Sequence, residues 1–132
     1  MTKLSVNVNK IALIRNSREG YIPNVLDISK ICIISGVDGI TVHPRSDMRH
    51  IRPSDVKELK KLTNNYSVEF NIEGNPFSPK EGDYPGFIKL VSSVIPDQCT
   101  LVPDDPEQLT SDHGWNLKED TYDLKEVIKK LK

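Results

Sequence analysis

The chain has 132 residues, of which 36% are hydrophobic and 28% are charged, and its formal net charge is -1. This balance suits one soluble globular domain and gives no electrostatic reason to expect nucleic acid or an anionic membrane as a partner. No apolar run approaches the length of a membrane span. The first residues resemble a strand and not a signal peptide. Cys32 and Cys99 form no metal-binding pair, so we expect buried, reduced thiols and a cytoplasmic location.

Short β-like runs alternate with longer helix-like runs along the chain. Alternating polarity and β-branched residues predict strands over 4–9, 39–43, 67–73 and 98–102. Apolar residues at helical spacing predict helices over 24–35, 53–65 and 87–95, and a fourth that begins near 120–121. Breaker-rich or polar stretches predict loops over 75–83 and 103–116.

Four β/α units in succession indicate an α/β fold with a parallel sheet and right-handed crossovers. Two architectures fit this order: a small open doubly wound sheet, or part of a (β/α)8 barrel. Both place function in the loops that follow the strands. We therefore predict a single domain over 1–132, with its active site at the carboxyl ends of the strands.

Polar side chains gather in those loops. They are Asn7, Asn9, Lys10, Arg15 and Arg18 after the first strand; His43, Arg45, Arg49 and His50 after the second; Glu73 at the end of the third; and Thr110 and His113 after the fourth. Positive charge in strand-end loops suits a small phosphorylated or carboxylated substrate, although any single arginine is as often ordinary surface charge.

His43 and Glu73 each follow an apolar strand directly. Together they form a candidate acid/base pair for carbonyl chemistry, because both side chains can be tuned to exchange protons near neutral pH. The alternative is structural: a hydrogen-bonding histidine, and a glutamate that caps a helix or pairs with an arginine. The histidine spacing does not match a metal site, and no glycine-rich nucleotide loop is present.

Four segments, in this order along the chain, resemble the pyridoxine 5′-phosphate synthase family of vitamin B6 biosynthesis. They are 6–12 (VNVNKIA) with 15–18 (RNSR), 36–45 (GVDGITVHPR) with 49–51 (RHI), 70–74 (FNIEG), and 100–104 (TLVPD) with 109–111 (LTS). The resemblance implies a (β/α)8 TIM barrel. It also implies a ring-closing condensation of 1-deoxy-D-xylulose 5-phosphate with 3-amino-2-oxopropyl phosphate, which releases phosphate and water and needs no metal or organic cofactor.

The resemblance also implies roles for individual residues. His43 and Glu73 correspond to proton acceptors. Asn7 and Arg18 correspond to ligands of the aminoketone phosphate, and Arg45, His50 and Thr110 to ligands of the deoxyxylulose phosphate. Asn9 and Lys10 stand where many members have an Asp-His pair, and they are expected to contact substrate.

The chain is shorter than the roughly 200 to 250 residues of such a barrel. The family's later carboxylate, its proton-donating histidine and its glycine-rich phosphate site have no counterpart here. We therefore expect the N-terminal half of a synthase, a truncated chain that is active only with a second half. The alternative is a non-catalytic half-barrel that binds phosphate ligands or serves as an assembly module. Its open edges would favour a homo-oligomer.

Overall fold

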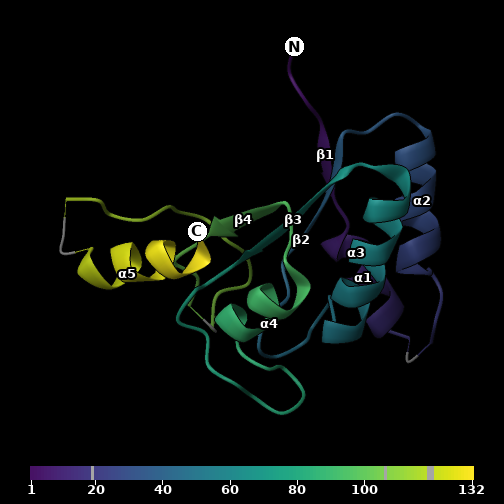
Figure 1. The fold of residues 1–132 in the computed structure, drawn as a ribbon. Coiled ribbons are helices and arrows are strands. Elements are labelled where there is room, and N and C mark those ends of the chain that lie inside the picture. The colour runs from purple at the N-terminus through teal and green to yellow at the C-terminus, as the bar shows by residue number, and fades with distance from the viewer. Residues whose placement is uncertain (19, 106, 119–120) are drawn as a thin grey trace.

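The computed structural model describes residues 1–18, 20–105, 107–118 and 121–132. In this part of the chain four parallel strands form one sheet in the order β1-β2-β3-β4 (Figure 1). The strands are β1 (Ser5–Asn7), β2 (Gly39–Val42), β3 (Glu69–Gly74) and β4 (Gln98–Leu101). The helices are α1 (Asn9–Asn16), α2 (Val25–Ile34), α3 (Pro53–Tyr66), α4 (Phe87–Val94) and α5 (Tyr122–Leu131). The predicted alternation of strands and helices is confirmed.

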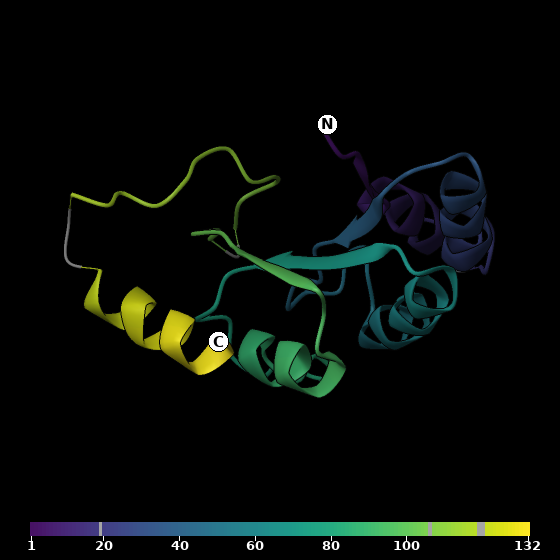
Figure 2. The ribbon, with the colours of Figure 1, turned by 45° about the horizontal axis from the view of Figure 1, so that its top comes forward.

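The two faces of the sheet differ in what covers them. In Figure 2, α3, α4 and α5 lie along one side of the sheet, and the segment that follows β4 passes over the other side. Strands in sequential order with their helices on one side are wound as in a barrel, whereas a doubly wound sheet reverses its strand order and carries helices on both faces. The arrangement therefore favours the barrel architecture over the open doubly wound sheet.

The helix-covered face of the sheet forms the hydrophobic core. Ile40 and Val42 of β2 and Phe70 and Ile72 of β3 alternate along their strands and are completely buried. They belong to one apolar cluster with side chains from α3 and α4, namely Val56, Leu59, Phe87, Leu90 and Val91. The strand period of two and the helical spacing of three to four residues bring these positions together.

The opposite face of the sheet carries a chain of side-chain hydrogen bonds across all four strands. The hydroxyls of Ser5 in β1 and Thr41 in β2 lie 2.7 Å apart. The Asn71 amide of β3 donates to Thr41 over 3.4 Å, and the Thr100 hydroxyl of β4 donates to Asn71 over 3.1 Å. Thr41 and Asn71 are buried, so these bonds satisfy polar groups that would otherwise destabilise the sheet.

Local sequence signals set several element ends. The Asn24 side chain caps α2 by accepting hydrogen bonds from two backbone N–H groups of its first turn. Pro53 occupies the first turn of α3, where a missing N–H costs nothing. Gly36 follows α2 with a φ of +98°, a left-handed backbone conformation that glycine adopts readily at the end of a helix. The start of the last helix was predicted at 120–121, and residue 120 lies outside the described residues.

The first strand was predicted too long, because a helix begins within the predicted loop region. β1 ends at Asn7 and α1 starts at Asn9. Helix α1 has only a weak apolar stripe because Lys10, Arg15 and Asn16 interrupt it, so its period was hidden in the sequence. The placement of Arg15 at the rim is wrong: its side chain is buried on α1. The full burial expected for Cys32 and Cys99 is also wrong, since both are free but only half-buried.

Arg15 instead joins α1 to the start of α3. Its guanidinium donates to both carboxylate oxygens of Asp55, over 2.7 and 2.9 Å, and to the backbone carbonyl of His50 over 3.1 Å. Both side chains are nearly inaccessible to solvent. Asp55 also accepts the backbone N–H of Arg52, so one carboxylate caps α3 and holds the buried arginine. This contact anchors the end of the loop that follows β2.

Replacing Asp55 by alanine should lower the free energy of unfolding by about 3–5 kcal/mol, because it leaves a buried guanidinium without its counter-charge. Urea denaturation measures the change. Glu126→Ala is the matched control, since it removes the exposed ion pair with Lys129 on α5 and should cost less than about 1 kcal/mol. Equal effects of the two substitutions would contradict a dominant role for burial.

Candidate active site

A cavity of about 460 Å³ opens at the carboxyl ends of the strands. It brings together every residue to which the family resemblance gives a role, except Arg18. The lining residues are Asn7, Asn9, Lys10, Leu13, His43, Arg45, Arg49, His50, Glu73, Leu109, Thr110 and Ser111. Residues up to 104 positions apart in sequence therefore meet in one space, as the parallel sheet requires.

Arg18 and His113 lie elsewhere. Arg18 is exposed beyond the end of α1 and does not line this cavity. His113 is also exposed, and its Nδ1 contacts the Asp112 carboxylate. A substrate role for Arg18 stays a prediction that the geometry of the cavity does not support directly.

Two asparagines connect the end of β1 to the neighbouring strand ends. Asn7 Oδ1 accepts the backbone N–H of Asn9 over 2.9 Å, a turn that starts α1 immediately after the strand. Asn9 Oδ1 accepts the backbone N–H of His43 over 2.8 Å. The Asn7 amide donates to Glu73 Oε2 over 3.4 Å. The early start of α1 also places Lys10 on the cavity wall.

His43 is buried directly after β2, and its Nε2 lies 3.4 Å from Asp104 Oδ2. Burial lowers the pKa of His43 below its usual value, and the Asp104 carboxylate opposes that change. The guanidinium of Arg45 adds to the lowering. A histidine with a lowered pKa is neutral near pH 7 and can accept a proton there.

His50 is held in one tautomer. Its Nδ1 accepts the backbone N–H of Ile51 over 2.9 Å, so the neutral ring carries its hydrogen on Nε2. Burial, and then the neighbouring His43, lower the pKa of His50 to about 4. The two rings lie 6.3 Å apart between centroids. At neutral pH His50 is therefore an uncharged hydrogen-bond donor on the cavity wall.

Glu73 differs from an ordinary surface carboxylate. Burial raises its pKa, and the negative charge of Asp104 raises it further, while the hydrogen bond from Asn7 works in the opposite direction. A carboxylate that is partly desolvated beside another one binds a proton more readily. Glu73 and His43 are thus both placed to accept protons on one cavity wall.

The two arginines of the β2 loop hold the segment that follows β4. Arg45 donates to the backbone carbonyls of Asp105 and Gln108, each over 3.0 Å. Arg49 donates to the same Gln108 carbonyl over 3.2 Å and to the carboxylate of Asp47. Through these bonds Thr110 and Ser111 come to line the cavity. The charge predicted for substrate binding therefore also positions a loop.

Sequence reasoning did not single out Asp104, whose carboxylate lies beside His43. Asp104 was part of the last segment that resembles the family, but no role was assigned to it. The available signal was its position, because Asp104 follows β4 as Glu73 ends β3. Within the described residues, no cluster of three or more His, Cys, Asp or Glu side chains is arranged to hold a metal ion. No helix in this same part of the chain is long and apolar enough to cross a bilayer.

Comparison with known proteins assigns the chain to a family. The family described as "Pyridoxal phosphate biosynthesis protein PdxJ" matches residues 4–132. The chain belongs to this family. It is a family of TIM barrels, and the four β/α units described above form the N-terminal half of such a barrel.

Curated relatives carry the name pyridoxine 5′-phosphate synthase. The chain is 56% identical over 131 residues to the protein of Xanthomonas axonopodis pv. citri (strain 306), which covers 99% of this chain and 51% of that protein. It is 50% identical over 131 residues to the protein of Xylella fastidiosa (strain M23), with 99% and 50% covered. The chain thus spans about half the length of the curated relatives it matches.

The low pKa of His50 has a measurable consequence. Between about 4 and the usual 6.5, the folded chain binds fewer protons than the unfolded chain at this position, so stability falls as the pH drops through this window. NMR titration of the imidazole should give a midpoint of about 4. His50→Asn should flatten, without abolishing, the acid decline measured by urea denaturation, because the pKa of His43 is shifted in the same direction. A midpoint near 6.5 for His50 contradicts this.

Proposed function

We propose that this chain supplies one sector of the active site of a pyridoxine 5′-phosphate synthase. The reaction is the ring-closing condensation of 1-deoxy-D-xylulose 5-phosphate with 3-amino-2-oxopropyl phosphate, with release of phosphate and water. The observation that carries the proposal is the cavity in which His43 and Glu73 meet the predicted phosphate ligands other than Arg18. Family membership and the names of the relatives support the same reaction.

The chemistry requires groups that accept protons as the amine of one substrate condenses with the ketone of the other. We assign this role to His43, which its lowered pKa keeps uncharged near pH 7, and to Glu73, whose raised pKa lets it bind a proton more readily. Bringing two substrates together in a partly enclosed space lowers the entropic part of the activation barrier. Neither residue needs a metal for this role.

We assign the deoxyxylulose phosphate to Arg45, His50 and Thr110. Arg45 supplies positive charge, and the His50 Nε2–H and the Thr110 hydroxyl supply neutral donors to oxygen atoms. We assign the aminoketone substrate to the β1 side of the same cavity, which is lined by Asn7, Asn9 and Lys10. We assign Arg18 to the aminoketone phosphate on the family resemblance alone.

Three statements about context belong to the same proposal. The chain acts in the cytoplasm, where its free cysteines stay reduced. It forms a homo-oligomer, and residues 1–132 behave as a single folded unit. Its partners are small phosphorylated molecules and not nucleic acid or membrane.

A second candidate is a half-barrel that binds phosphate ligands without turnover or serves assembly. One observation favours it: β1 and β4 lie at the two edges of the described sheet, with a partner strand on one side only. Unpaired parallel edges invite another sheet segment. Binding without catalysis would distinguish this candidate from the synthase.

Activity is tested with both substrates, on the chain alone and on the chain mixed with the C-terminal half of a relative. Phosphate release and product formation are measured together. His43→Gln and Glu73→Gln should each lower kcat by about 10²- to 10⁴-fold in whichever arm is active, as expected for a lost proton acceptor. Glu126→Gln, on the exposed face of α5, is the control and should leave kcat unchanged.

The outcomes separate the two candidates. Turnover that depends on His43 and Glu73 supports the synthase. Substrate binding by calorimetry, without turnover in either arm, supports the phosphate-binding half-barrel. If neither substrate binding nor turnover is detected in either arm, both candidates are ruled out.

A further inference from the structure

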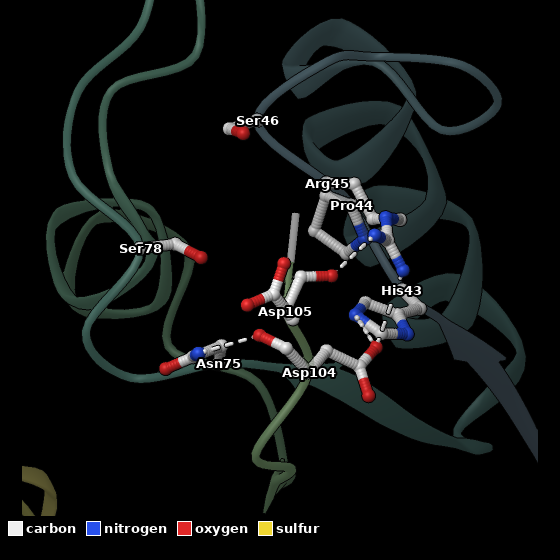
Figure 3. Close-up of a pocket in the computed structure, with 8 residues that line it drawn as sticks. All are labelled: His43, Pro44, Arg45, Ser46, Asn75, Ser78, Asp104 and Asp105. Atoms are coloured by element: carbon white, nitrogen blue, oxygen red, sulfur yellow. Dashed lines mark hydrogen bonds and ion pairs between the residues drawn. The ribbon is translucent and has the colours of Figure 1, made fainter. Parts of the chain in front are cut away.

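Asp104 is a buried carboxylate that contacts His43 and Arg45 of the candidate site but does not itself line the cavity. It lies after β4 and is 6% exposed. Figure 3 shows its side chain beside the ring of His43 and near the guanidinium of Arg45. Its Oδ2 atom lies 3.4 Å from His43 Nε2 and 3.4 Å from Arg45 Nη1, and it accepts the hydroxyl of Ser111 over 2.7 Å.

The backbone of Asp104 is fixed as well as its side chain. The Asn75 amide, just past the end of β3, donates to the Asp104 carbonyl over 2.7 Å. Arg45 donates to two backbone carbonyls farther along this segment, those of Asp105 and Gln108. A carboxylate held from both sides cannot easily turn away from the imidazole, so its distance to His43 is a built feature of the site.

We propose that Asp104 is the positioning residue of His43: its carboxylate orients the imidazole through Nε2 and sustains its capacity to accept a proton. This inference rests on the proposed role of His43 in the condensation. An acid held beside one ring nitrogen favours the tautomer with hydrogen on that nitrogen and stabilises the protonated ring, which leaves the other nitrogen to accept the proton.

The charges around His43 determine the sign of the effect. Those that face it from the surrounding elements are Lys10 on α1; Arg45, Asp47, Arg49 and His50 in the loop after β2; Glu73 at the end of β3; and Asp104 after β4. Burial lowers the pKa of His43, Asp104 raises it, and Arg45 lowers it. Without the charge of Asp104, burial and Arg45 remain, so the pKa of His43 must fall further.

The pKa of Glu73 provides an independent measure of the effect of the Asp104 charge. Asp104 adds to the burial that raises the pKa of Glu73. Neutralising Asp104 should therefore lower the pKa of both proton acceptors at once. A purely structural role for Asp104, such as holding the loop after β4, would not move both values in this way.

The test is an NMR titration of His43 in the intact chain, which requires no catalysis. Asp104→Asn keeps the shape of the side chain and removes its charge, and the midpoint of His43 should fall by about one pH unit or more. The nitrogen shifts should also show a loss of preference for hydrogen on Nε2. Asp104→Glu restores the charge and should bring the midpoint back toward the original value.

Two matched variants complete the titration. Asp105→Asn removes the charge of the adjacent carboxylate, which accepts only the Glu107 N–H among the described hydrogen bonds, and should leave the midpoint of His43 in place. Ser111→Ala removes a hydrogen bond from Asp104 and keeps its charge, so the midpoint of His43 should rise or stay. An unchanged midpoint in folded Asp104→Asn overturns the proposal. If that variant does not fold, a fall in Ser111→Ala overturns it.

Turnover gives the second readout. In the active arm of the condensation assay, Asp104→Asn should lower kcat by about 10- to 100-fold and move the acidic limb of the pH profile downward, with a smaller change in KM. If no arm shows turnover, the proposed function fails, and the NMR titration still decides whether Asp104 controls the imidazole. A normal kcat and pH profile in Asp104→Asn contradicts the positioning role even if the synthase assignment holds.

Discussion

Parallel pairing of the four strands is the constraint on which the site depends. Each strand pairs with the next in a register that aligns their carboxyl ends, so that Asn7 lies opposite Thr41 and Glu73 lies opposite Thr100. Side-chain hydrogen bonds on the face opposite the helices reinforce this register, and a slip of one residue would turn these polar side chains into the apolar core. The loops that follow the strands therefore lie together at one edge of the sheet.

Two buried guanidinium–carboxylate contacts hold those loops in place. Arg15 with Asp55 fixes the far end of the loop after β2 against α1 and α3. Arg45 with Asp104 fixes the near end of the same loop against the segment after β4. Such pairs add little net stability compared with apolar packing. Removing one partner leaves the other charge buried and unpaired, so the pairs specify a single arrangement of the loops. His43 lies two residues before Arg45, beside the second of these two contacts.

The elements with strong local signals were predictable, and those that depend on distant contacts were not. The core strands and α2, α3 and α4 follow from apolar periodicity, which is a local property of the chain. Helix α1 was missed because its buried polar residue, Arg15, interrupts the apolar pattern, and only Asp55, 40 positions away, explains that burial. Asp104 was passed over for the same reason, since its partners come from other strands.

The sequence by itself determined the order of the β/α units, the residue types available at the strand ends and the family to which they belong. The tertiary structure alone decided which of these residues share a cavity: it gathered His43 and Glu73, left Arg18 outside, and buried Arg15 as a structural contact. It also decided their proton affinities. A pKa depends on burial and on charges that lie close in space, and neither can be read from the order of residues along the chain.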